Sequence, residues 1–200
     1  MAIEQIGTYH LSDNPQLFEI QRNNNYVFSV PLLGGPSGDP LIRAGAIGTE
    51  SNAEIKNASE LLRLSVSSAA IPHFSQEAIE IKRGNSTLRY AGVPNFEAGS
   101  FQFHDFIGAQ TKDILMAWQN LSYDVNTEKV ASLQRTNYKR LAYLIEYPPD
   151  YYEPVRTWKL YGCWISSLSE DSYTNDNGDK HMITATIQYD RAQIDLTSVL

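Results

Sequence analysis

The chain has 200 residues, of which 42% are hydrophobic and 20% charged, and its formal net charge is −7. This length and composition predict one soluble globular domain, and the acidic balance argues against specific nucleic-acid binding, which normally needs a basic surface. The lone Cys163 excludes an intrachain disulfide. The N-terminus is polar and has no apolar core, so no secretion signal is expected. No apolar run is long enough to span a bilayer, so no membrane insertion is expected.

The first part of the chain divides into an arm, a strand and a long loop. Residues 1–25 are polar and are expected to form an N-terminal arm. An apolar run from Tyr26 to Pro31 predicts the first strand. Residues 33–59 carry repeated glycines and prolines, and a loop of this length inside a compact domain is usually functional or mobile.

Alternating apolar residues predict three strands in the middle of the chain. The pattern runs through Leu62, Leu64 and Val66, then through Ile79 and Ile81, and then through Phe101 and Phe103. A turn is expected at Gly84-Asn85 after the second of these strands. One helix is expected over residues 109–123, because Ile114, Trp118 and Leu121 recur at helical spacing and can pack on a sheet.

Three further strands are predicted near the C-terminus. They cover Tyr138 to Glu146, Arg156 to Ile165 and Met182 to Asp190, with a polar loop from Ser169 to Lys180 before the last. The sequence therefore predicts a mostly β, antiparallel domain over residues 26–190, barrel-like or sandwich-like, with one flanking helix. Residues 191–200 are expected to form a C-terminal tail.

The motifs that usually carry chemistry are incomplete. The run from Gly34 to Gly38 lacks the Lys-Ser/Thr of a phosphate-binding loop and the spacing of a nucleophile elbow. The acidic loop from Glu170 to Asp179 fails the EF-hand pattern, leaving a tight turn at Asn177-Gly178 or a weak cation site. Pro148-Pro149 indicates a turn between strands or, alternatively, a short proline-rich ligand.

The histidines do not indicate a site either. His10, His73, His104 and His181 are scattered, with no pair at metal-ligand spacing on one element. His104 is expected at a surface or interface. The sequence therefore predicts no catalytic, cofactor-binding or metal-binding residue, no cofactor and no enzymatic activity.

One ordered series of short motifs resembles a known family. The series begins with Ala70-Ile71-Pro72, and its other members are Ile79-Glu80-Ile81, Gly84-Asn85, Arg89-Tyr90-Ala91-Gly92, Phe101 to Asp105, Ala117-Trp118, Trp158 to Trp164 and Tyr189-Asp190. It resembles the tail tube proteins of contractile-tailed bacteriophages, the T4-like tube family, over about residues 26–190. The departures are the insertion at residues 33–59 and the longer ends of the chain.

The resemblance implies a fold and a role. The fold would be a β-sandwich-like subunit with a flanking helix, shared with type VI secretion tubes. Six copies would form a ring whose joined sheets make an inner barrel, and rings would stack into a tube within the tail sheath, on a baseplate. The tube would hold the tape-measure protein and then conduct DNA during genome ejection. The protein would be part of the virion and would assemble in the host bacterial cytoplasm.

Two alternatives remain beside the tube. Within the same class, the chain could be a tube-initiating baseplate ring or a secretion-type tube protein. From another class, it could be a monomeric β-sandwich module that binds glycans, since Tyr147, Tyr151, Tyr152 and Tyr161 offer stacking faces. The net charge of −7 suits a conduit that must not hold DNA phosphates, but acidic proteins are common.

Overall fold

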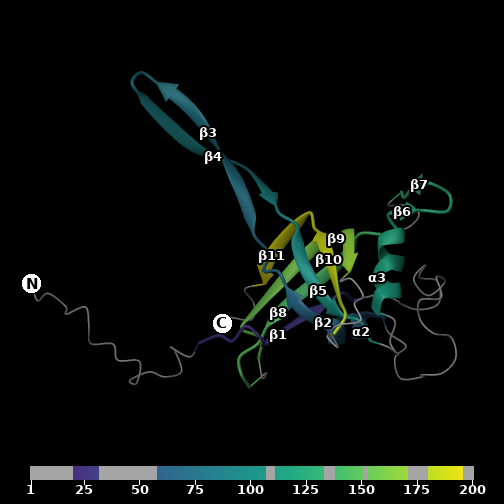
Figure 1. Cartoon of the computed structure of the whole chain (residues 1–200). Coiled ribbons are helices and arrows are strands. Elements are labelled where there is room, and N and C mark those ends of the chain that lie inside the picture. The colour runs from purple at the N-terminus through teal and green to yellow at the C-terminus, as the bar shows by residue number, and fades with distance from the viewer. Residues whose placement is uncertain are drawn as a thin grey trace, which may run out of the picture.

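The computed structural model describes residues 20–31, 58–106, 111–132, 138–150, 153–170 and 180–195. This part is mostly β, with antiparallel sheets and two helices, which confirms the predicted fold class. No helix in it is long and apolar enough to cross a membrane. The chain forms a two-layered body from which one long hairpin projects (Figure 1).

Seven strands form the body, in the order β1-β8-β9-β10-β5-β2, with β11 paired to β9. All the pairings are antiparallel. These strands are β1 (Tyr26–Ser29), β2 (Val66–Ala69), β5 (Gly99–His104), β8 (Arg140–Glu146), β9 (Arg156–Glu170), β10 (Met182–Gln188) and β11 (Arg191–Asp195).

Strand β9 belongs to both layers because it bends at Gly162. Its first half pairs with β8 and β11, and its second half, residues 164–170, pairs with β10. Gly162 has a φ of 71°, which side chains other than glycine rarely adopt. We call β1-β8-β9-β11 the first sheet and the second half of β9 with β10, β5 and β2 the second sheet. A bend of this kind is how a strand turns a corner between two packed sheets.

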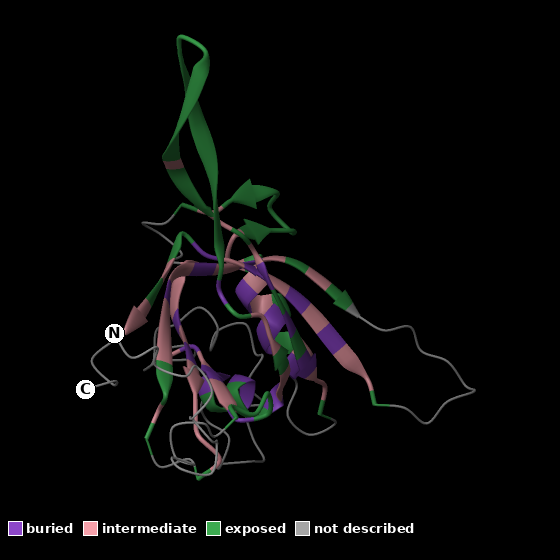
Figure 2. Cartoon of the chain, turned by 90° about the vertical axis from the view of Figure 1, so that its left-hand side faces the viewer, coloured by how far each residue is buried: buried purple, intermediate pink, exposed green. Residues whose placement is uncertain are grey.

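The core lies between the two sheets and the helices, as the buried stripes in Figure 2 show. Phe28 of β1 packs on Phe101 and Phe103 of β5, with ring centroids 4.6 and 6.4 Å apart. Helix α3 (Thr111–Asn120) buries Ile114, Leu115 and Trp118 against this core. The Trp118 indole Nε1 donates to the Tyr138 carbonyl at 3.0 Å, so the largest buried side chain also satisfies its polar atom.

Most predicted elements are confirmed. The helix expected over residues 109–123 is α3. Six of the seven predicted strands are also present, as β1, β3 (Phe74–Arg83), β5, β8, β9 and β10. Residues 191–195, expected as part of a tail, form β11 along β9. The glycine-rich run from Gly34 to Gly38 and most of the acidic loop lie outside the described residues.

The strand predicted through Leu62, Leu64 and Val66 is wrong. Residues Ala58–Ser65 form helix α2, and only Val66–Ala69 are a strand. Ala58, Leu61 and Leu62 are buried while Leu64 is exposed, which is a helical pattern. Arg63 and Glu60 also pair at i and i+3, at 2.8 Å. The three-residue alternation was too short to outweigh these features.

Candidate assembly interface

A long hairpin stands away from the body and packs on nothing else along most of its length. Strands β3 (Phe74–Arg83) and β4 (Ser86–Phe96) pair with each other alone among the described strands. Gly84 has a φ of 63° in the two-residue turn predicted at Gly84-Asn85, as a type II′ turn requires. Figures 1 and 2 show the hairpin extending beyond the sheets with its residues exposed.

One face of this hairpin is apolar. Ile79 lies opposite Tyr90 and Ile81 lies opposite Leu88, so the four side chains share one face. Ile79, Ile81 and Tyr90 are 54%, 51% and 54% exposed. We call these four residues the hairpin apolar face. An isolated two-stranded hairpin is at best marginally stable in water, so this face is a candidate for contact with residues outside the described part of the chain.

The opposite face of the hairpin is polar. Glu80 lies opposite Arg89, and the Arg89 Nε donates to Glu80 Oε1 at 2.8 Å. Lys82 lies opposite Thr87 on the same side. The hairpin is therefore amphipathic, with one face suited to water and one suited to burial.

The base of the hairpin is tied to the core. The Phe74 and Phe96 rings lie 5.5 Å apart, and Phe96 reaches the Tyr189 ring at 6.2 Å. His73 Nε2 lies 3.1 Å from Glu97 Oε2 across the two segments that lead into the hairpin. These contacts fix where the hairpin leaves the body, so its apolar face has a defined position.

The second sheet has two further features suited to assembly. In the described chain, β2 pairs only with β5, and residues 164–170 of β9 pair only with β10. Each of these strands therefore presents a backbone edge to an outside strand. Natural proteins usually protect such edges with charges, prolines or covering elements, but residues 66–69 contain none of these.

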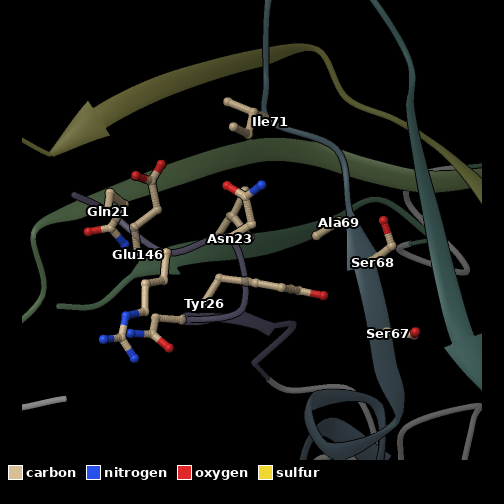
Figure 3. A pocket seen from close by; sticks show the side chains of 11 residues that line it. Gln21, Asn23, Tyr26, Ser67, Ser68, Ala69, Ile71 and Glu146 are labelled. Carbon is tan, nitrogen blue, oxygen red and sulfur yellow. The ribbon is translucent and has the colours of Figure 1, made fainter. Parts of the chain in front are cut away.

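A pocket of about 370 Å³ with a mixed polar and apolar lining lies between β1 and β2, the two ends of the sheet order (Figure 3). Tyr26 extends from β1 toward β2, where Ser68 and Ala69 line the other side. Burial raises the pKa of the Tyr26 phenol above its usual range. The charged residues that line this pocket are Arg22 and Glu146. The Glu146 carboxylate already accepts hydrogen bonds from the Arg156 guanidinium and the Trp158 indole.

The residues considered for chemistry stay apart in the described structure. Within this part of the chain, no group of three or more His, Cys, Asp or Glu side chains is placed to hold a metal ion. His104 lies half-buried at the end of β5, 6.3 Å from the Phe106 ring. Cys163 is buried in the core, and desolvation raises the pKa of its thiol to about 12, so it is not a nucleophile near neutral pH.

The tyrosines considered for glycan stacking are also separated. Tyr161 lies on the outer side of β9 under the Arg191 guanidinium, 4.3 Å from the ring centroid. Tyr147 follows β8, where its backbone N–H donates to the Asn25 carbonyl. Tyr151 and Tyr152 lie outside the described residues. Sequence reasoning missed the hairpin apolar face because alternation alone does not say whether a face is covered.

Comparison with known proteins identifies the fold. No family model and no curated protein matches the chain. The solved structures it resembles include the anti-feeding prophage tube terminating cap, at 12% identity and a TM-score of 0.60, covering 98% of this chain and 99% of that one. A second is the sheath/tube terminator of an extracellular contractile injection system (PVC), at 14% identity, a TM-score of 0.58, and coverage of 88% and 97%.

A third similar structure comes from the sheath-tube complex of the PVC system in its extended state. It shares 16% identity at a TM-score of 0.57, with coverage of 94% of this chain and 99% of that one. All three likenesses span nearly the whole of both chains, so they concern the complete fold. The resemblance indicated by the sequence motifs is thereby confirmed at the level of the fold. The chain has the fold found in contractile injection system tube and terminator assemblies.

Proposed function

We propose that this protein is a structural subunit that assembles into hexameric rings, and that these rings stack to form the inner tube of a contractile particle. The observation that carries the proposal is the hairpin apolar face on a chain with this fold. Ile79, Ile81, Leu88 and Tyr90 have no cover within the described chain, and a second copy in the neighbouring ring would supply it.

The energy available from this face is substantial but limited. Burying an exposed Ile or Leu side chain stabilises by about 1.5–3 kcal/mol, so covering the exposed halves of these four contributes roughly 3–6 kcal/mol. Association costs an estimated 4–15 kcal/mol in lost freedom. A single hairpin contact is therefore weak, and stable assembly needs many such contacts in a closed ring.

The free edges of the second sheet supply the lateral contact. If β2 of one copy pairs with residues 164–170 of β9 in the next, each copy uses two different edges. Such a head-to-tail contact closes into a ring when a whole number of copies completes one turn, and closure covers both of these edges in every copy. Six copies, as the resemblance implies, would make one continuous inner barrel.

The partners follow from this arrangement. A sheath would surround the tube and a baseplate would start it, and the alternative positions are a tube-initiating ring, a terminator or a secretion-type tube. In a phage tail the passage would take a tape-measure protein and then DNA. The role is structural and needs no catalytic residue, so the protein would act as a component of a virion or a virion-like particle.

Replacing Ile81 by serine tests the proposal. We expect Ile81→Ser to fold with an unchanged unfolding midpoint, because the side chain packs only within the hairpin, but to lose rings and tubes in electron micrographs. Lys82→Ser is the matched control, since Lys82 is the next residue on the opposite face, and it should assemble normally. Normal tubes from both variants would contradict the proposal, as would a wild-type chain that never assembles.

A second candidate function rests on the pocket between β1 and β2. Its mixed polar and apolar lining with one half-buried tyrosine would suit a sugar, and this is the site a glycan-binding module would use. Binding of glycans to a strictly monomeric chain, lost in Tyr26→Ala, would favour this candidate. Glycan screening and sedimentation of the same sample decide between the two.

A further inference from the structure

The outward side of the second sheet carries two rows of neutral polar side chains. One row crosses all four strands through Ser68, Gln102, Thr184 and Ser169, which lie opposite one another in register. The other runs through Ser100, Thr186 and Ser167. Their neighbours along β10, which are Ile183, Ala185 and Ile187, point into the core. We call the seven outward residues the neutral face.

Charge is scarce in this sheet. The strand residues 66–69, 99–104, 164–170 and 182–188 include one Asp, Glu, Lys or Arg, which is Glu170 at the very end of β9, although such residues make up 20% of the chain. The first sheet differs, because Lys159 pairs with Asp195 at 2.5 Å on its outward side and Arg191 covers Tyr161 there. The strands of the second sheet therefore contribute little to the net charge of −7.

From these observations, and resting on the proposed function, we propose that the neutral face lines the passage of the tube and that the passage is built for an extended polypeptide. Both sheets have edges at which a neighbouring copy can add a strand, at β1 and β11 in the first sheet and at β2 and residues 164–170 in the second. The lack of charge on its outward side is what distinguishes the second sheet. The hairpin leaves the end of this same sheet, between β2 and β5, so it would reach along the tube axis to the next ring (Figure 1).

The chemistry of the lining points to the cargo. A basic lining would hold nucleic-acid phosphates, and an acidic lining would repel them. A polypeptide has charges of both signs, so any charged lining would hold part of it. Hydroxyl and amide groups create no long-range field, and they exchange hydrogen bonds with peptide groups and water at little net cost. A neutral wall therefore lets a chain of mixed charge slide.

Cysteine accessibility tests the assignment of faces. Thr184→Cys places a thiol on the neutral face, and Gln193→Cys places one on the outward side of β11, where Gln193 is exposed. The buried Cys163 serves as an unreactive background. The reagent is a maleimide on a polymer too bulky to enter the tube.

In free subunits both thiols should react. In assembled wild-type-like tubes, Thr184→Cys should lose its labelling while Gln193→Cys keeps it. Labelling of Thr184→Cys in the tube, or protection of both thiols, would overturn the assignment of faces. Absence of tubes from the wild-type chain would instead refute the proposed function, so the two failures are distinguishable.

A quenching experiment tests the cargo. Tubes contain a few Thr184→Cys subunits that carry a small dye, and the added polymer carries a quencher. An unfolded polypeptide with no net charge should quench the dye equally at low and high salt. Single-stranded DNA should quench less at low salt, where the field of the acidic subunits is unscreened. Equal or stronger quenching by DNA at low salt would overturn the polypeptide assignment and favour a nucleic-acid passage.

Discussion

Replacing Gly162 by alanine tests the corner at which β9 passes from the first sheet to the second. A Cβ at this position would overlap the Asp190 carboxylate, whose oxygens accept from the Lys139 ammonium at 2.7 and 2.8 Å. The left-handed φ of 71° costs a side-chain-bearing residue about 1–2 kcal/mol. Displacing the largely exposed Asp190 carboxylate adds no more than about 1 kcal/mol, because water screens the ion pair.

We therefore expect Gly162→Ala to lower the free energy of unfolding by roughly 1–3 kcal/mol. Urea titration of the subunit, followed by tryptophan fluorescence, measures this change. Gly84→Ala is the control, because Gly84 also has a positive φ but open space around it, at the tip of the hairpin. Its strain stays in the hairpin, so the midpoint of the sheets should not move. Equal midpoints for Gly162→Ala and wild type would refute the corner argument.

Two further predictions concern the core. Trp118→Ala should lower the unfolding free energy by about 3–5 kcal/mol in the same urea assay. Met116→Ala, on the exposed side of α3, is the control and should change the unfolding free energy little. Similar losses in the two variants would contradict the packing of α3. Burial raises the pKa of the Cys163 thiol from 9.0 to about 12. The contribution of the protonated thiol to the free energy of unfolding is therefore complete below pH 9 and is lost as the pH rises toward 12. Cys163→Ala should flatten the resulting alkaline decline in urea midpoints, and parallel pH profiles for the two proteins would show that the thiol is not buried.

Local patterns predicted the parts of the fold whose two faces differ in burial. In β10, Ile183, Ala185 and Ile187 alternate with polar residues, and the sheet buries the apolar set. Helix α3 was found for the same reason, at its own period. Strand β11 was not predicted, because its five residues form a strand only through pairing with β9, some 30 residues earlier in the chain. No local sequence pattern contains such a pairing.

The candidate interface could be predicted only in part. The alternation of Ile79 and Ile81 identified a strand with an apolar face, but such a pattern normally means that the same chain covers the face. Here the apolar face stays about half exposed within the described chain, and this exposure depends on tertiary packing that no local pattern contains. Free sheet edges are backbone features and have no residue signature, so β2 and the second half of β9 gave no signal. The serines and threonines of the neutral face resembled an ordinary solvated surface.

Electron microscopy of the purified, concentrated full-length chain, with light scattering of the same sample, shows directly whether the protein assembles into rings and tubes. We expect rings with a central hole that stack into tubes, and we expect Ile81→Ser, but not Lys82→Ser, to lose them. A strict monomer at the highest soluble concentration, indistinguishable from Ile81→Ser in both measurements, would contradict this expectation.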